Sequence, residues 1–320
     1  MTASTALPRK VAVIGAGDIG CGWAALCASA GWPVTIFDSH ARTAELASVE
    51  VPRRARALVA LDRASSGIVE RGLQEFEQVR SLLHAVSGAD WVLEAIPEDL
   101  LAKQKLLSAV DEMAPAGVLL TSSSSGLAPK DVFGMCRHAD RCLVVHPLNP
   151  PELIPVVEVI AGPKSSAEAR ERADGYLRAL GRMPVHVRKA VPGYVVGRIA
   201  AAVWRECIDL VLTGVVDVDD LDRAVSLGPA LGWAVAGPHL TYHLSAGDQG
   251  VQIFLQRLLQ SFESWWSNLA TWHQLDPDQQ RALTHAIERA YNVKIDELRA
   301  ARDRRLGAIL RALEQARTET

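Results

Sequence analysis

The chain has 320 residues, of which 49% are hydrophobic and 22% are charged, and its formal net charge is −3. This length leaves room for two domains, and the balanced charge creates no field that would attract nucleic acid or an anionic membrane. No apolar run reaches the ~18 residues needed to cross a bilayer, and the first ten residues hold no hydrophobic signal core. We therefore expect a cytoplasmic protein that binds neither nucleic acid nor membrane.

The chain contains five cysteines, an odd number, and none of them belongs to a C-x-x-C pair. This pattern suggests neither a disulfide framework nor a zinc site, and we expect no bound metal. The cysteines are Cys21, Cys27, Cys136, Cys142 and Cys207.

The first predicted element is a strand over Val11–Ile14, a short apolar run typical of a strand covered on both faces. Gly15, Gly17 and Gly20 follow with G-x-G-x-x-G spacing and lead into a helix of small residues over 21–30. In a dinucleotide site, the first glycine makes the tight turn and the second lets a pyrophosphate approach the backbone. The third lets the helix pack closely on the strand. The N-terminus of the helix then offers N–H groups and partial positive charge to the phosphates.

A second strand is predicted over Val34–Phe37, and Asp38 closes it about 20 residues beyond the glycines. A carboxylate at this position accepts hydrogen bonds from both ribose hydroxyls and repels a 2′-phosphate, which favours NAD over NADP. A glycine-rich turn in another kind of α/β protein is the alternative, but strand, helix, strand and acid all stand in the order that a dinucleotide site requires. We therefore predict NAD binding by Gly15, Gly17, Asp18, Ile19, Gly20 and Asp38.

Residues 39–83 are polar and arginine-rich with helical periodicity, and residues 100–113 read as an amphipathic helix. Two polar clusters, Ser122–Ser125 and His146–Asn149, each follow a predicted strand. Ligands of open α/β sheets bind beyond the carboxyl ends of the strands, so both clusters are candidate site segments. The buried strands predicted in this region cover residues 90–96, 118–121, 142–145 and 156–160.

The pattern changes after Val187, and from Tyr194 onward the chain reads as helices. These are predicted over 195–212, 218–226, 249–266, 277–291 and 295–315, the last as a solvated helix packed on its neighbours. The prediction is an α/β fold with a Rossmann-type, doubly wound and mostly parallel sheet, followed by an all-helical C-terminal domain. We place an NAD-binding domain at residues 1–190 and a helical substrate and dimerisation domain at 191–320.

His146 is the first candidate for chemistry, and Glu158 stands twelve residues beyond it, on the next predicted strand. A dehydrogenase needs a group that removes the hydroxyl proton as hydride leaves the same carbon. A histidine suits that work, and a carboxylate on its far nitrogen fixes the tautomer and stabilises the imidazolium. A structural histidine beside a solvated glutamate is the alternative, and the spacing alone leaves both interpretations open.

The serines of 122–125 either cap the turn before the helix at Pro129 or contact a substrate hydroxyl beside the expected nicotinamide. Glu98 and Lys103 stand five residues apart, and their spacing favours nothing beyond a surface ion pair.

The string of motifs resembles the L-3-hydroxyacyl-CoA dehydrogenase superfamily over nearly the whole chain. The family pattern is a Rossmann start, V-x-E-A-x-x-E-x-x-x-x-K, S-x-x-S-x-L, H-P-x-N-P, a V-E-V strand and a P-G-[FY] junction. These stand here at Gly15–Gly20, Val92–Lys103, Ser122–Leu127, His146–Pro150, Val157–Val159 and Pro192–Tyr194. The resemblance implies that His146 is the base, that Glu158 orients it and that Ser125 donates to the substrate oxygen. It also implies that Glu98, Lys103 and Asn149 line the NAD and its nicotinamide end, and that the protein is a homodimer.

Three departures from the family pattern stand out. Gly197 replaces the asparagine that usually follows the P-G pair by four residues and contributes to the active site. The segment after Asp38 lacks the lysines that hold CoA in other members, although Arg42 and the arginines at 53, 54 and 56 offer substitutes. The usual lysine- and glycine-rich motif at the C-terminus is absent as well.

Residues 228–250 resemble the branch that acts on small free acids, which includes L-carnitine and L-gulonate 3-dehydrogenases and lambda-crystallin. Trp233 and Tyr242 of this segment either face a quaternary ammonium by cation–π attraction or are core aromatics. The resemblance therefore implies an NAD-dependent dehydrogenase that oxidises the 3-hydroxyl of a small free hydroxy acid, carnitine-like or gulonate-like. A hydroxyacyl-CoA dehydrogenase and a non-catalytic crystallin-like protein are the alternatives.

Overall fold

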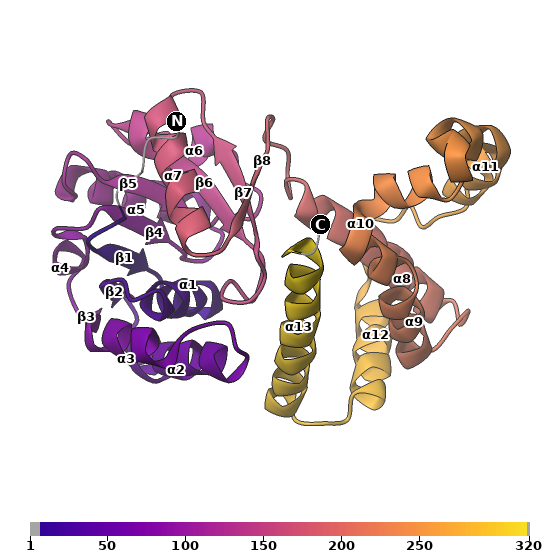
Figure 1. Ribbon diagram of the computed structural model, residues 1–320, viewed down its shortest axis with the longest axis horizontal. Coiled ribbons are helices and arrows are strands. Elements are labelled where there is room, and N and C mark those ends of the chain that lie inside the picture. Colours follow the sequence, from indigo (N-terminus) through magenta and orange to yellow (C-terminus); the bar gives the residue numbers. More distant parts are fainter. Residues whose placement is uncertain (1–6, 319–320) are drawn as a thin grey trace. The chain divides into compact units, whose positions relative to one another are not determined.

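The computed structural model describes residues 7–318 and divides into two compact units (Figure 1). Within the described residues, the first unit runs to Arg198 and also includes Asp303–Leu310, and the second takes Ile199–Arg302 and the segment from Arg311. The division into an NAD-binding domain at residues 1–190 and a substrate and dimerisation domain at 191–320 stays a prediction.

The first unit is built on an eight-stranded sheet with the order β3-β2-β1-β4-β5-β6-β7-β8. All neighbouring strands are parallel except β6 and β7. The predicted Rossmann-type, mostly parallel sheet is confirmed. The strands are β1 (Val11–Ile14), β2 (Val34–Phe37), β3 (Phe76–Val79), β4 (Trp91–Glu94), β5 (Leu119–Ser122), β6 (Cys142–Pro147), β7 (Val156–Ala161) and β8 (Met183–His186).

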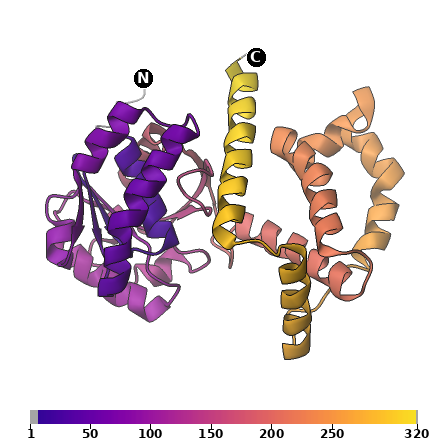
Figure 2. The same cartoon turned by 90° about the horizontal axis from the view of Figure 1, so that it is seen from below.

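Helices cover both faces of this sheet, because successive apolar side chains of each buried strand point to opposite sides. Val11 and Val13 of β1 pack with α1, α2, α3 and α7, whereas Ala12 and Ile14 pack with α4, α5 and α6. In the view of Figure 2 the purple helices α2 and α3 lie in front of the indigo strands. The helices are α1 (Asp18–Ser29), α2 (Ala41–Ala60), α3 (Ser66–Gln74), α4 (Leu82–Val86), α5 (Leu100–Met113), α6 (Pro129–Val132) and α7 (Ala167–Ala179).

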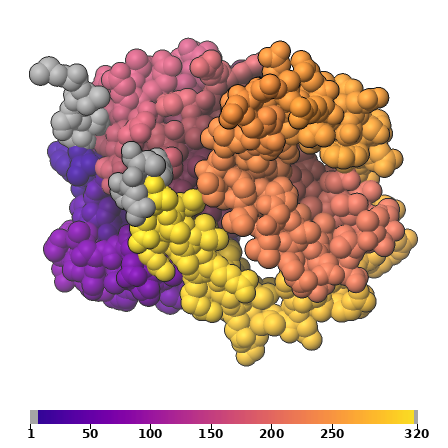
Figure 3. Space-filling model, turned by 45° about the vertical axis from the view of Figure 1, so that its right-hand side comes forward, coloured from indigo at the N-terminus to yellow at the C-terminus, as the bar shows by residue number. Residues whose placement is uncertain are grey.

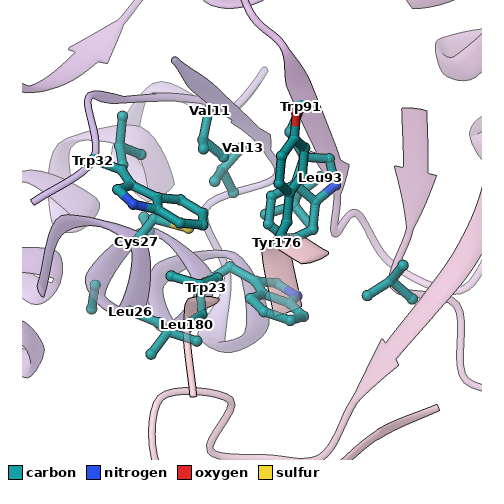
Figure 4. Packing of buried hydrophobic residues seen from close by; sticks show 14 of the residues in the cluster. Val11, Val13, Trp23, Leu26, Cys27, Trp32, Trp91, Leu93, Tyr176 and Leu180 are labelled. Carbon is teal, nitrogen blue, oxygen red and sulfur yellow. The ribbon is translucent and has the colours of Figure 1, made fainter. Parts of the chain in front are cut away.

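The core on the α1 side contains the large aromatic side chains of Trp23, Trp32, Trp91 and Tyr176 (Figure 4). Trp91 of β4 lies 6.1 Å from Trp23 of α1 and 5.4 Å from Tyr176 of α7, measured between ring centroids. The Trp91 indole N–H donates to Thr121 of β5, so its polar atom is satisfied inside the core. These contacts join two helices to the strands from which the candidate site residues emerge.

Several elements were not predicted from the sequence, among them helix α7 and the two strands and the helix described next. Strand β3 carries Glu77 and Gln78, and edge strand β8 is largely exposed and contains Pro184, so neither shows the apolar run of a buried strand. Helix α10 (Pro229–Leu244) is interrupted by Gly237 at φ 72°, followed by Pro238, and these residues hide its periodicity.

The second unit consists of helices, as predicted, and few of its described apolar residues are buried. Helix α10 buries none of its residues, and openings between the helices are visible in the space-filling view (Figure 3). Among the described residues, no helix is long and apolar enough to cross a membrane. Besides α10, the helices are α8 (Val196–Leu212), α9 (Val218–Leu227), α11 (Gly250–Trp266), α12 (Pro277–Ala290) and α13 (Ile295–Thr318).

Candidate active site

The glycine turn between β1 and α1 has the shape that a pyrophosphate needs. Gly15 has a φ of 101°, and a Cβ there would lie 2.6 Å from the carbonyl oxygen of Ala95. A Cβ on Gly20 would lie 1.8 Å from the carbonyl oxygen of Gly15, whereas a Cβ on Gly17 would meet nothing within 4 Å. Only the middle glycine therefore faces open space, which fits a bound phosphate group rather than close packing alone.

Asp38 directly follows β2, and its carboxylate binds the backbone of the glycine turn. Its Oδ2 accepts from the backbone N–H of Ala16 at 2.8 Å, and its Oδ1 accepts from that of His40 at 2.8 Å. The carboxylate is fixed by the backbone while its side chain remains 14% exposed, as a ribose ligand requires. Asp18 and Ile19 form the first turn of α1, where no side chain of the described chain caps the helix.

Lys103 does pair with Glu98, but its ammonium is buried and not on the surface as the spacing suggested. Its side chain is 1% exposed, and its Nζ lies 2.7 Å from Oε1 of Glu94, the last residue of β4, and 3.6 Å from Oε2 of Glu98. Lys103 also donates to the carbonyl oxygen of Ile96 at 2.9 Å, and Ser122 donates to the other oxygen of Glu94. This buried ion pair fixes the backbone that follows β4, beside the glycine turn.

Glu98 fixes the serine loop that follows β5. Its Oε1 accepts from the hydroxyl of Ser124 at 2.6 Å and from the backbone N–H groups of Ser125 and Gly126 at 2.9 and 3.2 Å. Ser125 itself is exposed, and its backbone N–H is held by Glu98. The hydroxyl of Ser124 also accepts from the backbone N–H of Leu127 at 3.1 Å, which supports the predicted capping of the turn, while contact with a substrate hydroxyl stays a prediction.

His146 and Glu158 stand directly opposite each other in the antiparallel pair β6–β7. Nδ1 of His146 lies 2.8 Å from Oε2 of Glu158, and the two side chains are 10% and 0% exposed. Both residues lie within their strands, so the prediction that His146 follows its strand was wrong, because β6 extends two residues further. With Glu158 ionised, Nδ1–H donates to the carboxylate and Nε2 is left to accept a proton.

The second oxygen of Glu158 holds the junction at the start of α8. It accepts from the backbone N–H groups of Val195 and Val196 at 2.9 and 3.1 Å. A buried carboxylate that receives three hydrogen bonds has little freedom to rotate. The orientation of the His146 ring is therefore tied to the backbone of the P-G-Y junction.

Tyr194 is the last residue of the P-G-[FY] junction, and its motif alone did not indicate that it would lie beside His146. It is 0% exposed, has a φ of 45°, and its ring centroid lies 5.5 Å from that of His146. Its hydroxyl donates to the carbonyl oxygen of Leu127 at 2.6 Å. Tyr194 thus joins the histidine to the serine loop, and burial raises the pKa of its phenol, which keeps it protonated.

Four of these segments emerge at one edge of the sheet, since β1, β4, β5 and β6 are neighbouring parallel strands. They are the glycine turn, residues 95–98, the serine loop and residues 146–149. Asn149 lies in the last of them and is exposed. The arrangement places a dinucleotide cradle and a histidine–carboxylate pair at the edge where ligands of such sheets bind.

Family models match this chain along most of its length. The model for the NAD-binding domain of 3-hydroxyacyl-CoA dehydrogenase matches residues 10–191, and the model for its C-terminal domain matches residues 193–283. The chain belongs to the 3-hydroxyacyl-CoA dehydrogenase family. It is an NAD-dependent oxidoreductase, and both the predicted family and the predicted cofactor are confirmed.

Curated relatives of this dehydrogenase extend over nearly its full length. L-carnitine dehydrogenase of Nocardiopsis dassonvillei is 35% identical over 311 residues, covering 96% of this chain and 92% of that one. L-carnitine dehydrogenase of Pseudomonas aeruginosa is 35% identical and covers 97% and 95%. A protein named 3-hydroxyacyl-CoA dehydrogenase from Gibberella moniliformis is 34% identical and covers 96% and 95%.

A solved structure has the same fold over almost the whole chain. It is a 5-formyl-3-hydroxy-2-methylpyridine 4-carboxylic acid 5-dehydrogenase, described as an NAD⁺-dependent dismutase. Its TM-score is 0.80 at 30% sequence identity, and the match covers 96% of this chain and 98% of that one.

Proposed function

We propose that this dehydrogenase oxidises the 3-hydroxyl of a small free 3-hydroxy acid, carnitine-like or gulonate-like, to the 3-keto acid. The observation that carries the proposal is the buried His146–Glu158 pair, at 2.8 Å, beside the loop that presents Ser125. NAD, when bound, supplies the hydride acceptor.

The proposed chemistry begins with the hydroxyl proton. His146 removes it through Nε2, and Glu158 stabilises the imidazolium that results while holding Nδ1 in place. Ser125 donates to the substrate oxygen, where negative charge would develop as the proton leaves. Asn149 is proposed to line the nicotinamide end, and Glu98 to fix the serine loop.

Lys103 has a narrower role in this proposal than the resemblance implied. Its ammonium is buried against Glu94, so we propose that it shapes the cofactor site through Glu94 and the backbone of Ile96.

The arginines of α2 support a free acid over a CoA ester. Arg53 pairs with Glu50 at 2.6 Å, Arg54 with Asp18 at 2.6 Å, and Arg56 with Glu70 at 2.8 Å. Each guanidinium is thus engaged by a carboxylate of its own unit. The identity to several L-carnitine dehydrogenases points to the same substrate class.

A cation–π role for Tyr242 finds less support. Its ring lies 5.1 Å from Phe254 and 5.7 Å from Phe262, measured between centroids, which favours a core aromatic of the helical unit.

We also propose a cytoplasmic homodimer. Large apolar side chains of α10 are exposed, among them Leu231 at 52%, Val235 at 74% and Leu244 at 63%. A second copy of the chain would bury them, as the family resemblance implies. Light scattering coupled to gel filtration tests the proposal, and a monomer at micromolar concentration would contradict it.

The decisive experiment measures NADH formation with carnitine, gulonate and 3-hydroxybutyryl-CoA as separate substrates. We expect turnover of a free acid, and loss of that turnover in His146→Gln with NADH binding retained. Turnover of the CoA ester alone would establish the hydroxyacyl-CoA alternative. NADH binding without turnover of any hydroxy acid would instead favour the crystallin-like alternative.

A further inference from the structure

The glycine turn contains an acidic residue at the place where an anionic pyrophosphate must bind. Asp18 is the first residue of α1, directly after the open Gly17, and its side chain is 58% exposed. A carboxylate there stabilises the helix N-terminus, yet it competes with a phosphate for the same N–H groups and repels it. A dinucleotide site with this sequence needs a compensating positive charge.

Arg54 of α2, the helix packed beside α1, supplies that charge. Its Nη2 lies 2.6 Å from Oδ1 of Asp18, and its Nη1 donates to the backbone carbonyl oxygen of the same residue at 3.0 Å. The Arg54 side chain is only 13% exposed, so water screens the pair weakly on that side. Glu50 and Glu152 approach it at 3.4 and 3.5 Å and hold it in place.

We infer that Arg54 is a positioning residue of the NAD site, which neutralises Asp18 and turns its carboxylate away from the space over Gly17. The two contacts of the guanidinium fix the backbone and the side chain of Asp18 together. The inference depends on NAD binding by this family and is independent of which hydroxy acid is oxidised.

The test compares NADH affinity by fluorescence titration in Arg54→Met, Asp18→Asn and the double variant, at 20 and 500 mM salt. Arg54→Met leaves Asp18 uncompensated, and we expect the Kd for NADH to rise about 10-fold at low salt and less at high salt. Asp18→Asn frees the guanidinium charge, so its Kd should stay equal or fall. The double variant should return to within about threefold of the parent protein.

Arg56→Met is the matched control, because Arg56 lies on the same helix and pairs with an exposed glutamate, Glu70, instead of Asp18. It should leave the Kd within about twofold. Arg54→Lys, which keeps the charge, should recover part of the affinity and guards against misfolding of the methionine variant. A double variant as weak as Arg54→Met would overturn the inference and show direct contact of Arg54 with the cofactor. So would a salt-independent defect, which would mark Arg54 as merely structural.

Discussion

Replacing Glu158 by glutamine separates the orienting role of this carboxylate from its structural role. Its Oε1 accepts from two backbone N–H groups at the start of α8, which a glutamine oxygen also accepts. The glutamine NH₂ group then faces Nδ1 of His146, the position now held by a carboxylate oxygen at 2.8 Å. Two donors cannot share that hydrogen bond, so the histidine proton moves to Nε2 and the proposed base can no longer accept.

The size of the effect follows from the burial of the pair. Glu158 is 0% exposed, so its hydrogen bond to a histidine that becomes charged is worth about 1.5–3 kcal/mol, or about 10- to 150-fold in rate. The wrong tautomer adds to this loss, and a carboxylate-to-amide change beside a catalytic histidine lowers kcat up to about 10⁴-fold. We therefore expect Glu158→Gln to lower kcat by about 10²- to 10⁴-fold, with the Kd for NADH nearly unchanged.

The assay is NADH formation at saturating substrate, together with thermal unfolding and NADH titration of each variant. The chain offers a matched control in His186, whose Nε2 lies 3.0 Å from Oδ2 of Asp174, at the same separation of twelve residues. That pair is 51% and 23% exposed, so Asp174→Asn should leave kcat unchanged. Retention of kcat in Glu158→Gln to within threefold, with a lowered Tm, would make the pair structural and refute the proposed base.

Three other predictions test the fold around this site. Gly15→Ala should abolish NADH binding and cost at least about 2 kcal/mol in unfolding free energy, measured in urea, because its φ is 101° and its Cβ meets backbone. Burial alone would raise the pKa of Asp111, but Arg141 holds that pKa below its usual value. The stabilisation is therefore present above about pH 4 and lost below it, so the deficit of about 3–5 kcal/mol expected in Asp111→Asn at pH 7 should shrink in acid. Burial raises the pKa of Cys21 to about 11, and iodoacetamide at pH 8 should modify Cys207 well before Cys21, as read by mass spectrometry.

The dinucleotide half of the site could be predicted because its signal is local. Gly15 and Gly20 stand in the turn and helix that directly follow β1, and a Cβ on Gly20 would meet Gly15 and Val13 of the same segment, whereas the space at Gly15 is limited by Ala95, after β4. The buried strands of the sheet could be predicted for the same reason, because each is marked by a short apolar run in the sequence. Strands β3 and β8 lie at the two ends of the sheet, where one edge has no neighbour and polar residues are tolerated.

The histidine–carboxylate pair required more than spacing. His186 and Asp174 have the same separation as His146 and Glu158, and they also form a contact, yet they lie on the surface. His146 and Glu158 differ from that surface pair because the β6–β7 register places them opposite each other, and no local sequence pattern encodes this pairing of strands. The family resemblance supplied this information, and the burial of Lys103 against Glu94 was missed because it depends on the same kind of non-local packing.

Gly197 stands where the family resemblance implies an active-site asparagine, and the junction geometry shows what this departure leaves unchanged. The backbone just before it is held by Glu158 through Val195 and Val196, and no side chain at 197 takes part. A Cβ at Gly197 would meet nothing within 4 Å, so the glycine is not required by packing. The missing asparagine therefore removes a side-chain amide without loosening the backbone that orients His146. We expect this departure to change which hydroxy acid binds while the proposed proton transfer remains intact.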